Sequence, residues 1–250
     1  MLKITDHARV REIRLERPPA NALNPEMISL LAKELPSAAD AADAVVLSGR
    51  PGMFSAGFDI PSLLHLDRDG VGHFWQSFLD LLGTIAKMPV PTVFALTGHA
   101  PAGGIVLSLF GDYRIMCGGN FKTGLNEVQV GLVVAPLIKN ALARLIGPHP
   151  AENILVSGAM LTPDQALDIG LVDEIEEDAE STVSRAVAWC EHMLSLPRNA
   201  MLLARELARE DLHGYFADAS QYQVESFVDL WFSDLTQTTL QMLASRLQQK

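Results

Sequence analysis

The sequence predicts an α/β protein, and two features of its pattern predict that class. Up to about residue 135, short β-rich runs alternate with longer segments whose apolar residues recur every three or four positions. Beyond residue 135 the β-rich runs nearly vanish, while helical periodicity continues almost to the C-terminus. Such alternation is typical of a sheet whose faces are covered by helices.

Four β-rich runs are predicted to form strands, and two segments between them are predicted to form helices. The runs are mostly apolar, which indicates strands that are largely buried. The helical segments repeat their apolar residues at the spacing of one helix face. The predicted strands span residues 9–16, 44–49, 92–98 and 112–117, and the predicted helices span residues 25–41 and 69–88.

The remainder of the chain is predicted to be helical. Its best-marked helix start is Thr162, followed by Pro163 at the first helical position and Gln165 in a capping-box pattern. Gly170 suits the C-terminal end of that helix. Further helices are predicted for residues 136–147 and from residue 180 onward, with breaks near Pro197 and Gly214.

A chain of 250 residues can form one large domain or two small ones. We predict an α/β core of residues 1–195 and a helical C-terminal region of residues 196–250. The C-terminal region is too small to bury its own apolar face, so it is expected to pack on the core or on another subunit.

Charge and cysteine content exclude several classes of partner and compartment. The chain has 19 basic and 30 acidic side chains, and no cluster of Lys and Arg stands out, which argues against a nucleic-acid partner. Cys117 and Cys190 lie far apart in sequence, as expected of reduced thiols. The N-terminal stretch is too polar for a signal peptide, and no apolar run reaches membrane-spanning length. We therefore expect a cytoplasmic protein without membrane contact.

The motifs of several common chemistries are absent from the sequence. It contains no G-x-G-x-x-G after a strand, no G-x-x-x-x-G-K-[ST], no G-x-S-x-G and no H-E-x-x-H. The seven histidines lack the spacing of metal ligands. His99 stands next to a glycine-rich turn, where a lone histidine is more typical of a packed or capping side chain.

Two junctions of similar build remain, "VVLSGRPGMFSAGFDI" and "VFALTGHAPAGGIVLSL", each a strand followed by a glycine turn. Gly57, Gly103 and Gly104 allow the backbone to expose N–H groups and a ligand to come close. Two such turns facing one point would hold an oxyanion by two backbone N–H groups. Either turn taken alone is more typical of a simple tight turn.

Glu127 is the single charge between Lys122 and Lys139. Its neighbours are mostly Gly, Leu, Val and Ile, and a carboxylate in such surroundings is costly to desolvate. A solvent-facing loop glutamate is the ordinary explanation. A carboxylate base beside the two glycine turns is the alternative.

These residues closely resemble the crotonase (enoyl-CoA hydratase/isomerase) superfamily. The resemblance covers nearly the whole chain and rests on the segments "RPPANALNPEM", "RPGMFSAGFDI", "GHAPAGGIVLSLFGDYRIM", "TGLNEVQVGL" and "LTPDQALDIGLVDEI", in family order. Within the superfamily, the sequences of these segments are most similar to those of Δ3,Δ2-enoyl-CoA isomerases of mitochondrial type. The resemblance implies a spiral of repeated ββα units with a helical C-terminal region that supports trimers or dimers of trimers.

The resemblance also implies an acyl-CoA thioester as substrate, with coenzyme A as part of that substrate and no separate cofactor or metal. Its carbonyl oxygen would lie between the backbone N–H groups of Phe58 and Gly103, with Glu127 as the catalytic carboxylate. Arg17 and Lys122 are candidate phosphate partners by charge alone. Further substrate contacts are implied for Ala56, Gly57, Asp59, Ile60, Gly104, Val106 and Asn126.

One position separates the two main activities of this family. Hydratases carry a second glutamate three residues beyond the oxyanion glycine, and that position is Val106 in this sequence. Moving a double bond needs one base only, so the sequence favours an isomerase that uses Glu127. A hydratase with one glutamate, another crotonase-type thioester reaction, and a non-catalytic binding protein on the same fold are the alternatives.

Overall fold

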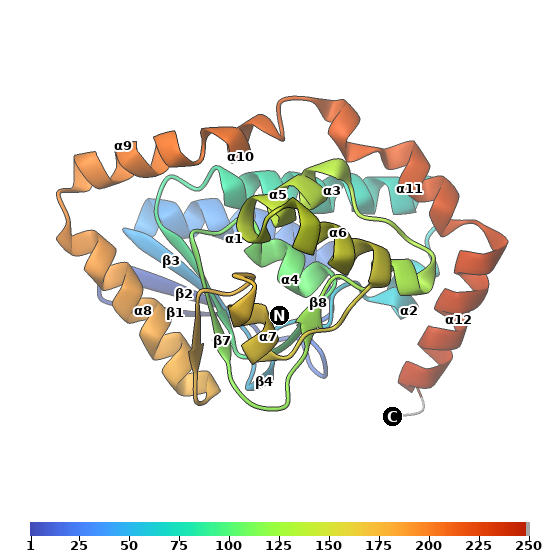
Figure 1. Ribbon diagram of the computed structural model, residues 1–250, viewed down its shortest axis with the longest axis horizontal. Helices are drawn as coiled ribbons and strands as arrows, with labels where there is room; N and C mark the ends of the chain where they lie inside the picture. The colour runs from blue at the N-terminus through green and yellow to red at the C-terminus, as the bar shows by residue number, and fades with distance from the viewer. Residues whose placement is uncertain (249–250) are drawn as a thin grey trace.

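The computed structural model describes residues 1–248, and its largest element is a six-stranded sheet (Figure 1). β1 and β2 form an antiparallel hairpin at one edge, and all other neighbours in the sheet are parallel. The predicted strands are confirmed as β2, β3, β5 and β7. In sheet order the strands are β1 (Leu2–His7), β2 (Val10–Leu15), β3 (Ala44–Ser48), β5 (Thr92–Leu96), β7 (Tyr113–Cys117) and β9 (Glu174–Glu176).

A second, smaller sheet contains three short parallel strands. They are β4 (Gly52–Met53), β6 (Gly98–Pro101) and β8 (Thr123–Gly124), in that order. Each follows a strand of the large sheet within a few residues, so β3, β5 and β7 lead into β4, β6 and β8 in turn. Helical segments follow each pair. This winding is the spiral of ββα units that the resemblance implied.

The helical segments that complete the three turns of the spiral differ in length. The first turn continues into α2 (Ile60–Leu63) and α3 (Arg68–Ala86), and the second into α4 (Gly103–Ser108). The third continues into the 3-10 turn η1 (Glu127–Val130) and then α5 (Pro136–Ile146). The predicted helix at residues 69–88 is therefore confirmed as α3.

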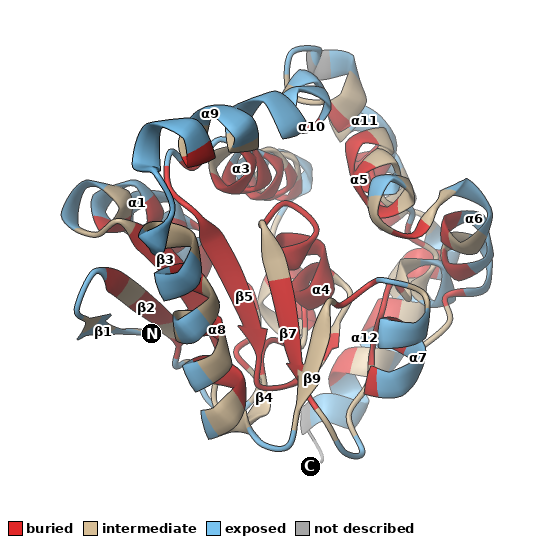
Figure 2. Cartoon of the chain, turned by 60° about the vertical axis from the view of Figure 1, so that its left-hand side comes forward, coloured by how far each residue is buried: buried red, intermediate tan, exposed pale blue. Residues whose placement is uncertain are grey.

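Helices cover both faces of the large sheet. On one side α1 (Pro25–Ala41) packs against α3 and β3. On the other, α8 (Ala179–Ser195) crosses β3, β5 and β7, whose residues are almost all buried (Figure 2). Strands buried on both faces explain why these runs are apolar without alternation.

The later helices follow the predicted starts and stops. α7 begins with the full capping box, in which the Thr162 side chain accepts from Gln165 N–H and the Gln165 side chain accepts from Thr162 N–H. α8 ends at Ser195, just before Pro197. The helices in this part are α6 (Pro148–Ser157), α7 (Pro163–Asp168), α9 (Arg198–Ala208), α10 (Glu210–Gly214), α11 (Val224–Trp231) and α12 (Asp234–Gln248).

The C-terminal helices pack on their own chain, which is one of the two arrangements expected for this region. The apolar residues of this region that could contact another subunit are Phe227, Leu230, Trp231 and Phe232. Instead α11 packs along α3, where the rings of Trp75 and Phe227 are stacked with centroids 3.9 Å apart. Phe227 and Trp231 are buried, and Leu230 and Phe232 are half-buried. Since these side chains find partners within the chain, they supply no patch that requires a second subunit.

The division predicted after residue 195 falls where α8 ends, and it stays a prediction about domains. Within residues 1–248, no helix combines the length and apolar composition needed to cross a membrane.

Candidate active site

The spiral brings three separate turns of the chain to one place. Phe58 follows β4, Gly103 follows β6 and Glu127 follows β8, and these three strands are neighbours in the small parallel sheet. Because parallel strands end at the same edge of a sheet, the segments after them lie side by side. The sequence separates these residues by up to 69 positions, and the topology reunites them.

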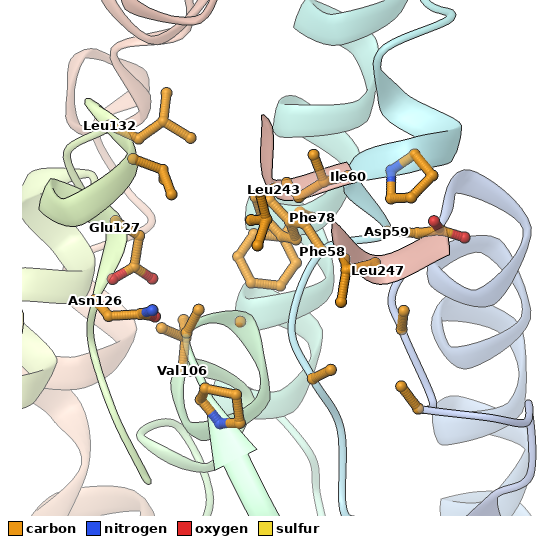
Figure 3. Close-up of a pocket in the computed structure, with 18 of the residues that line it drawn as sticks. Phe58, Asp59, Ile60, Phe78, Val106, Asn126, Glu127, Leu132, Leu243 and Leu247 are labelled. Atoms are coloured by element: carbon orange, nitrogen blue, oxygen red, sulfur yellow. The ribbon is translucent and has the colours of Figure 1, made fainter. Parts of the chain in front are cut away.

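A cavity of about 490 Å³ opens beside these turns. Figure 3 shows Glu127 and Asn126 entering it from one side, with Val106 below them and Phe58 and Phe78 across from them. Most of its wall is apolar. Of the predicted site residues, the cavity is lined by Ala56, Phe58, Asp59, Ile60, Gly103, Val106, Asn126 and Glu127.

The turn that carries Phe58 is held by hydrogen bonds on both sides of that residue. Leu23 N–H donates to Gly57 O at 2.8 Å, and Asp59 N–H donates to Leu23 O at 3.0 Å. This pairing directs the Phe58 N–H away from Leu23, and that N–H has no hydrogen-bond acceptor within residues 1–248. The Phe58 ring packs edge-on against Phe74 and Phe78, which fixes the residue while its N–H stays free.

Gly57 allows the turn that carries Phe58 to pack closely against the turn that carries Gly103. It adopts φ +80, a conformation that favours glycine, and a Cβ placed on it would lie 3.1 Å from the backbone nitrogen of Gly103. Gly103 opens α4, and its N–H likewise has no acceptor in the described part of the chain. Ala102 before it adopts φ 46, an uncommon value for a residue with a side chain. Two free N–H donors therefore belong to adjacent turns.

Gly57 and Gly104 do not line the cavity, unlike the other predicted substrate contacts. A Cβ on Gly104 would come within 2.5 Å of Ser55 O. Both glycines instead allow the two turns to pack closely. Their contribution to the site is therefore to the position of the Phe58 and Gly103 backbone.

Glu127 begins η1 and is half-buried, and its Oε2 is shielded from solvent without a hydrogen-bond partner. Burial raises the pKa of this carboxyl to about 7, against a smaller lowering by the residue's own backbone N–H. A carboxyl without a cationic partner in an apolar cavity is typical of a group that exchanges protons. The solvent-facing alternative is therefore not what the structure shows.

Asp59 is the second carboxylate of the cavity, and both of its oxygens accept hydrogen bonds from other residues of the chain. Arg17 Nη2 donates to Asp59 Oδ2 at 2.6 Å, and the Ser62 hydroxyl donates to the same oxygen at 2.7 Å. Ser62 N–H also donates to Asp59, which caps α2. Burial acts to raise the pKa of Asp59, but the hydrogen bonds from Ser62 and Arg17 hold it below its ordinary value.

Val106 and Asn126 complete the surroundings of Glu127. Val106, one turn into α4, is 1% exposed and presents an isopropyl group to the cavity. Asn126 precedes η1 and places its side-chain amide beside the glutamate (Figure 3). Arg17 lies at the cavity, whereas Lys122 does not line it.

Several lining residues were missed in the sequence analysis. Leu243 and Leu247 come from α12, about 120 residues after Glu127, and lie beside Ile60 and Phe58 (Figure 3). Leu132, Val133 and Val134 come after η1 and its C-cap residue, Gly131. Their only sequence signal is apolar character, which core residues share. His99 is a packed residue as expected, since its Nδ1 accepts from Lys122 N–H at 3.1 Å.

No three His, Cys, Asp or Glu side chains within residues 1–248 come together in a way that could hold a metal ion. The polar chemistry of the cavity therefore rests on two carboxylates, one guanidinium, one amide and backbone N–H groups. Such a set can remove a proton and hold a developing oxyanion.

Comparison with known proteins identifies the family to which the chain belongs. A sequence profile described as "Enoyl-CoA hydratase/isomerase" matches residues 5–250. Human mitochondrial enoyl-CoA delta isomerase 1 is 29% identical over 250 residues, covering 97% of this chain and 82% of that protein. A Mycobacterium avium protein described as "Probable enoyl-CoA hydratase" is 34% identical over 194 residues, covering 76% of this chain and 74% of that one.

Solved structures extend the similarity to the whole fold. The crystal structure of human mitochondrial Δ3-Δ2-enoyl-CoA isomerase matches with a TM-score of 0.92 at 28% identity, covering 99% of this chain and 98% of that chain. An enoyl-CoA hydratase/isomerase from Mycobacterium paratuberculosis shares the fold, with a TM-score of 0.86 at 22% identity over 96% of this chain and 97% of that chain. The chain has the crotonase fold and belongs to the enoyl-CoA hydratase/isomerase family.

Proposed function

We propose that this protein is an isomerase that converts 3-enoyl-CoA to trans-2-enoyl-CoA. Membership of the family supports a crotonase-type reaction on an acyl-CoA thioester. The choice of isomerisation within that class rests on the residues of the cavity. Glu127 acts as the single acid and base, and the N–H groups of Phe58 and Gly103 hold the thioester oxygen.

One observation carries this choice. Of the two carboxylates among the described residues of the cavity, Asp59 is paired with Arg17 and Ser62, and Glu127 alone has an oxygen without a partner. Activating a water for addition to C3 would call for a second positioned carboxylate. Val106, which offers no polar atom, occupies the position where hydratases of the family carry one.

The reaction that this arrangement supports balances with one proton. Glu127 takes a proton from C2, and the electron pair of that C–H bond passes through C1 to the thioester oxygen, giving a dienolate. The N–H groups of Phe58 and Gly103 donate to the developing negative charge. Protonated Glu127 then returns the proton to C4, and the double bond moves from C3–C4 to C2–C3.

The energetic contributions are shared between the two parts of the site. One oxyanion-hole donor is typically worth about 10²–10³ in rate, and a general base adds roughly 10²–10⁴. A pKa of about 7 suits a group that must both accept and return a proton near neutral pH. The apolar wall that raises this pKa is also a suitable surface for an acyl chain.

A hydratase is the second candidate, supported by the similarity to the mycobacterial protein described as a hydratase. Paired assays separate the two reactions. We expect the purified protein to isomerise 3-hexenoyl-CoA much faster than it hydrates crotonyl-CoA, both followed by the ultraviolet absorbance of the conjugated thioester. Hydration as fast as isomerisation would replace the proposal with a hydratase. Acyl-CoA binding without turnover of either substrate would indicate a binding protein.

A further inference from the structure

The turn that carries Glu127 is too small to hold its own position. η1 is a single 3-10 turn of four residues, and none of the four is fully buried. Backbone hydrogen bonds at its two ends join Gln129 N–H to Asn126 O at 3.0 Å, Gly131 N–H to Val128 O at 3.2 Å and Leu132 N–H to Glu127 O at 3.1 Å. The direction of the Glu127 side chain therefore depends on contacts between this turn and other parts of the chain.

Two hydrogen bonds join this turn and its C-cap residue to other helices. On one side Gln129 Nε2 donates to Gly158 O, at the end of α6, at 2.8 Å. On the other side the Thr236 hydroxyl, from α12, donates to Gly131 O at 3.1 Å. Thr236 is 1% exposed, so water does not compete for this bond.

The fit between Thr236 and Gly131 is close. Gly131 adopts φ +81, and a Cβ on it would lie 2.4 Å from Thr236 Oγ1. The threonine hydroxyl thus occupies the space that a side chain at position 131 would need. The Ser233 hydroxyl donates to Thr236 Oγ1 at 3.0 Å, which helps to orient the Thr236 hydroxyl.

We propose that Thr236 is a positioning residue, which sets the geometry of Glu127 by holding the carbonyl of Gly131. The inference rests on the proposed role of Glu127 as the acid and base. α12 also contributes Leu243 and Leu247 to the cavity wall. The hydroxyl and the wall residues are separate side chains on one helix, so their effects can be separated by substitution.

The test uses Thr236→Val, which keeps the shape of the side chain and removes the hydroxyl. A misplacement of about 1 Å in a catalytic group can cost about a hundredfold in rate, so we expect kcat to fall by about tenfold to a hundredfold. KM should change less than about threefold, because the wall residues are untouched. Thr236→Ser restores the hydroxyl and should recover most of kcat.

The matched control is Thr238→Val, on the same helix. The Thr238 hydroxyl is exposed and donates within the helix to Asp234 O at 2.8 Å, so its removal should leave kcat unchanged. Thermal unfolding followed by circular dichroism compares the stability of the variants. Wild-type kcat in Thr236→Val, or an equal loss in Thr238→Val, overturns the proposal.

A second measurement does not depend on the reaction. The carboxyl ¹³C shift of Glu127, identified by its loss in Glu127→Gln, reports the titration of this group. Glu127 lines the cavity described above and also a second cavity, which includes Lys139. The other charged side chains of these two cavities are Arg17, Asp59 and Lys139, and none of them is changed in these variants. A loosened turn admits water, so the pKa should fall toward its ordinary value in Thr236→Val and return in Thr236→Ser.

The isomerase rate and the titration of Glu127 distinguish a failure of the proposed function from a failure of the proposed role of Thr236. If the wild-type protein isomerises no 3-enoyl-CoA, the proposed function is wrong, and the titration of Glu127 still decides the role of Thr236. An unchanged Glu127 pKa in Thr236→Val, together with a lost kcat that Thr236→Ser does not recover, would indicate general damage to the fold and overturn the positioning role.

Discussion

Gly57 lies against Gly103 so closely that a Cβ on Gly57 would come within 3.1 Å of the Gly103 nitrogen. Gly57→Ala should therefore displace the second turn and strain a backbone at φ +80, lowering kcat/KM by about 10²–10³ through loss of one oxyanion donor. Gly52→Ala is the matched control, since Gly52 adopts φ +84 with no atom within 4 Å of the added Cβ. Similar losses in both variants would assign the effect to backbone strain alone.

Glu127→Gln is expected to fold, to bind acyl-CoA, and to lose about two orders of magnitude or more in isomerase kcat, because the base is removed. Isothermal titration with a saturated acyl-CoA checks binding, and initial rates with 3-hexenoyl-CoA check kcat. Near-wild-type turnover would refute the single-base mechanism and direct attention to Asp59.

The same variant should be more stable than the wild type above pH 7. Between the ordinary carboxyl pKa and about 7, folded Glu127 keeps a proton that the unfolded chain has lost, so wild-type stability falls as pH rises through this range. The cost of the buried carboxylate reaches at most about 3 kcal/mol above pH 7. Urea unfolding at pH 5 and pH 8 should show a wild-type deficit relative to Glu127→Gln that is larger at pH 8 than at pH 5.

The pH dependence of kcat/KM follows from the same group. Only ionised Glu127 can take the C2 proton, so kcat/KM should fall about tenfold per pH unit below a midpoint near 7 and level off above it. Rates with 3-hexenoyl-CoA between pH 5 and 9 check this. A midpoint near 4.5 would mean that the carboxylate is hydrated in solution and that the apolar wall does not shield it.

Val106→Glu should raise the rate of crotonyl-CoA hydration. The increase should be about 10²–10⁴-fold if the new carboxylate is well placed. The substitution puts a carboxyl in place of a buried isopropyl group, so stability should fall by roughly a few kcal/mol. Val106→Gln has a similar shape without an acid and should gain no hydratase activity. Rapid hydration by the wild type would show that Val106 does not separate the two reactions.

Assembly into a trimer or a dimer of trimers stays a prediction, which now depends on other apolar residues than those of α11. With Phe227 and Trp231 buried, the exposed apolar residues include Leu203 and Leu207, four positions apart on α9 and 67% and 75% exposed. Light scattering should give three or six times the chain mass of 27.2 kDa. A stable 27.2 kDa species at micromolar concentration would refute assembly.

The elements that the sequence predicts well are those with long, clear patterns. The helix predicted at residues 25–41 is α1 with the same bounds, because Asn24 and Pro25 mark its start and a regular apolar face continues from there. β1 was missed because LKITDH is polar and largely exposed at a sheet edge. The small-sheet strands escape sequence patterns altogether, since two to four residues rich in Gly and Pro show no period.

The candidate site divides in the same way. The two glycine turns and the carboxylate of Glu127 stand out in the sequence itself, whereas Phe58 was assigned to the site only through the family resemblance. Leu243 and Leu247 could not be predicted, because an apolar residue on a helix gives no sign of whether it faces a core or a cavity. Thr236 could not either, since its role depends on a contact with Gly131, 105 positions away.

The separate origin of the three active-site turns bears on how such a protein can acquire new chemistry. Each turn follows its own strand, so a mutation in the third turn or one helical turn into α4 leaves the Phe58 and Gly103 backbone in place. In the proposed mechanism, the groups that hold the carbonyl belong to the main chain, which substitutions change only indirectly, while the group that moves the proton is a side chain. If the proposed mechanism holds, selection can redirect the fate of the enolate by single substitutions, while the backbone groups that stabilise this enolate stay unchanged.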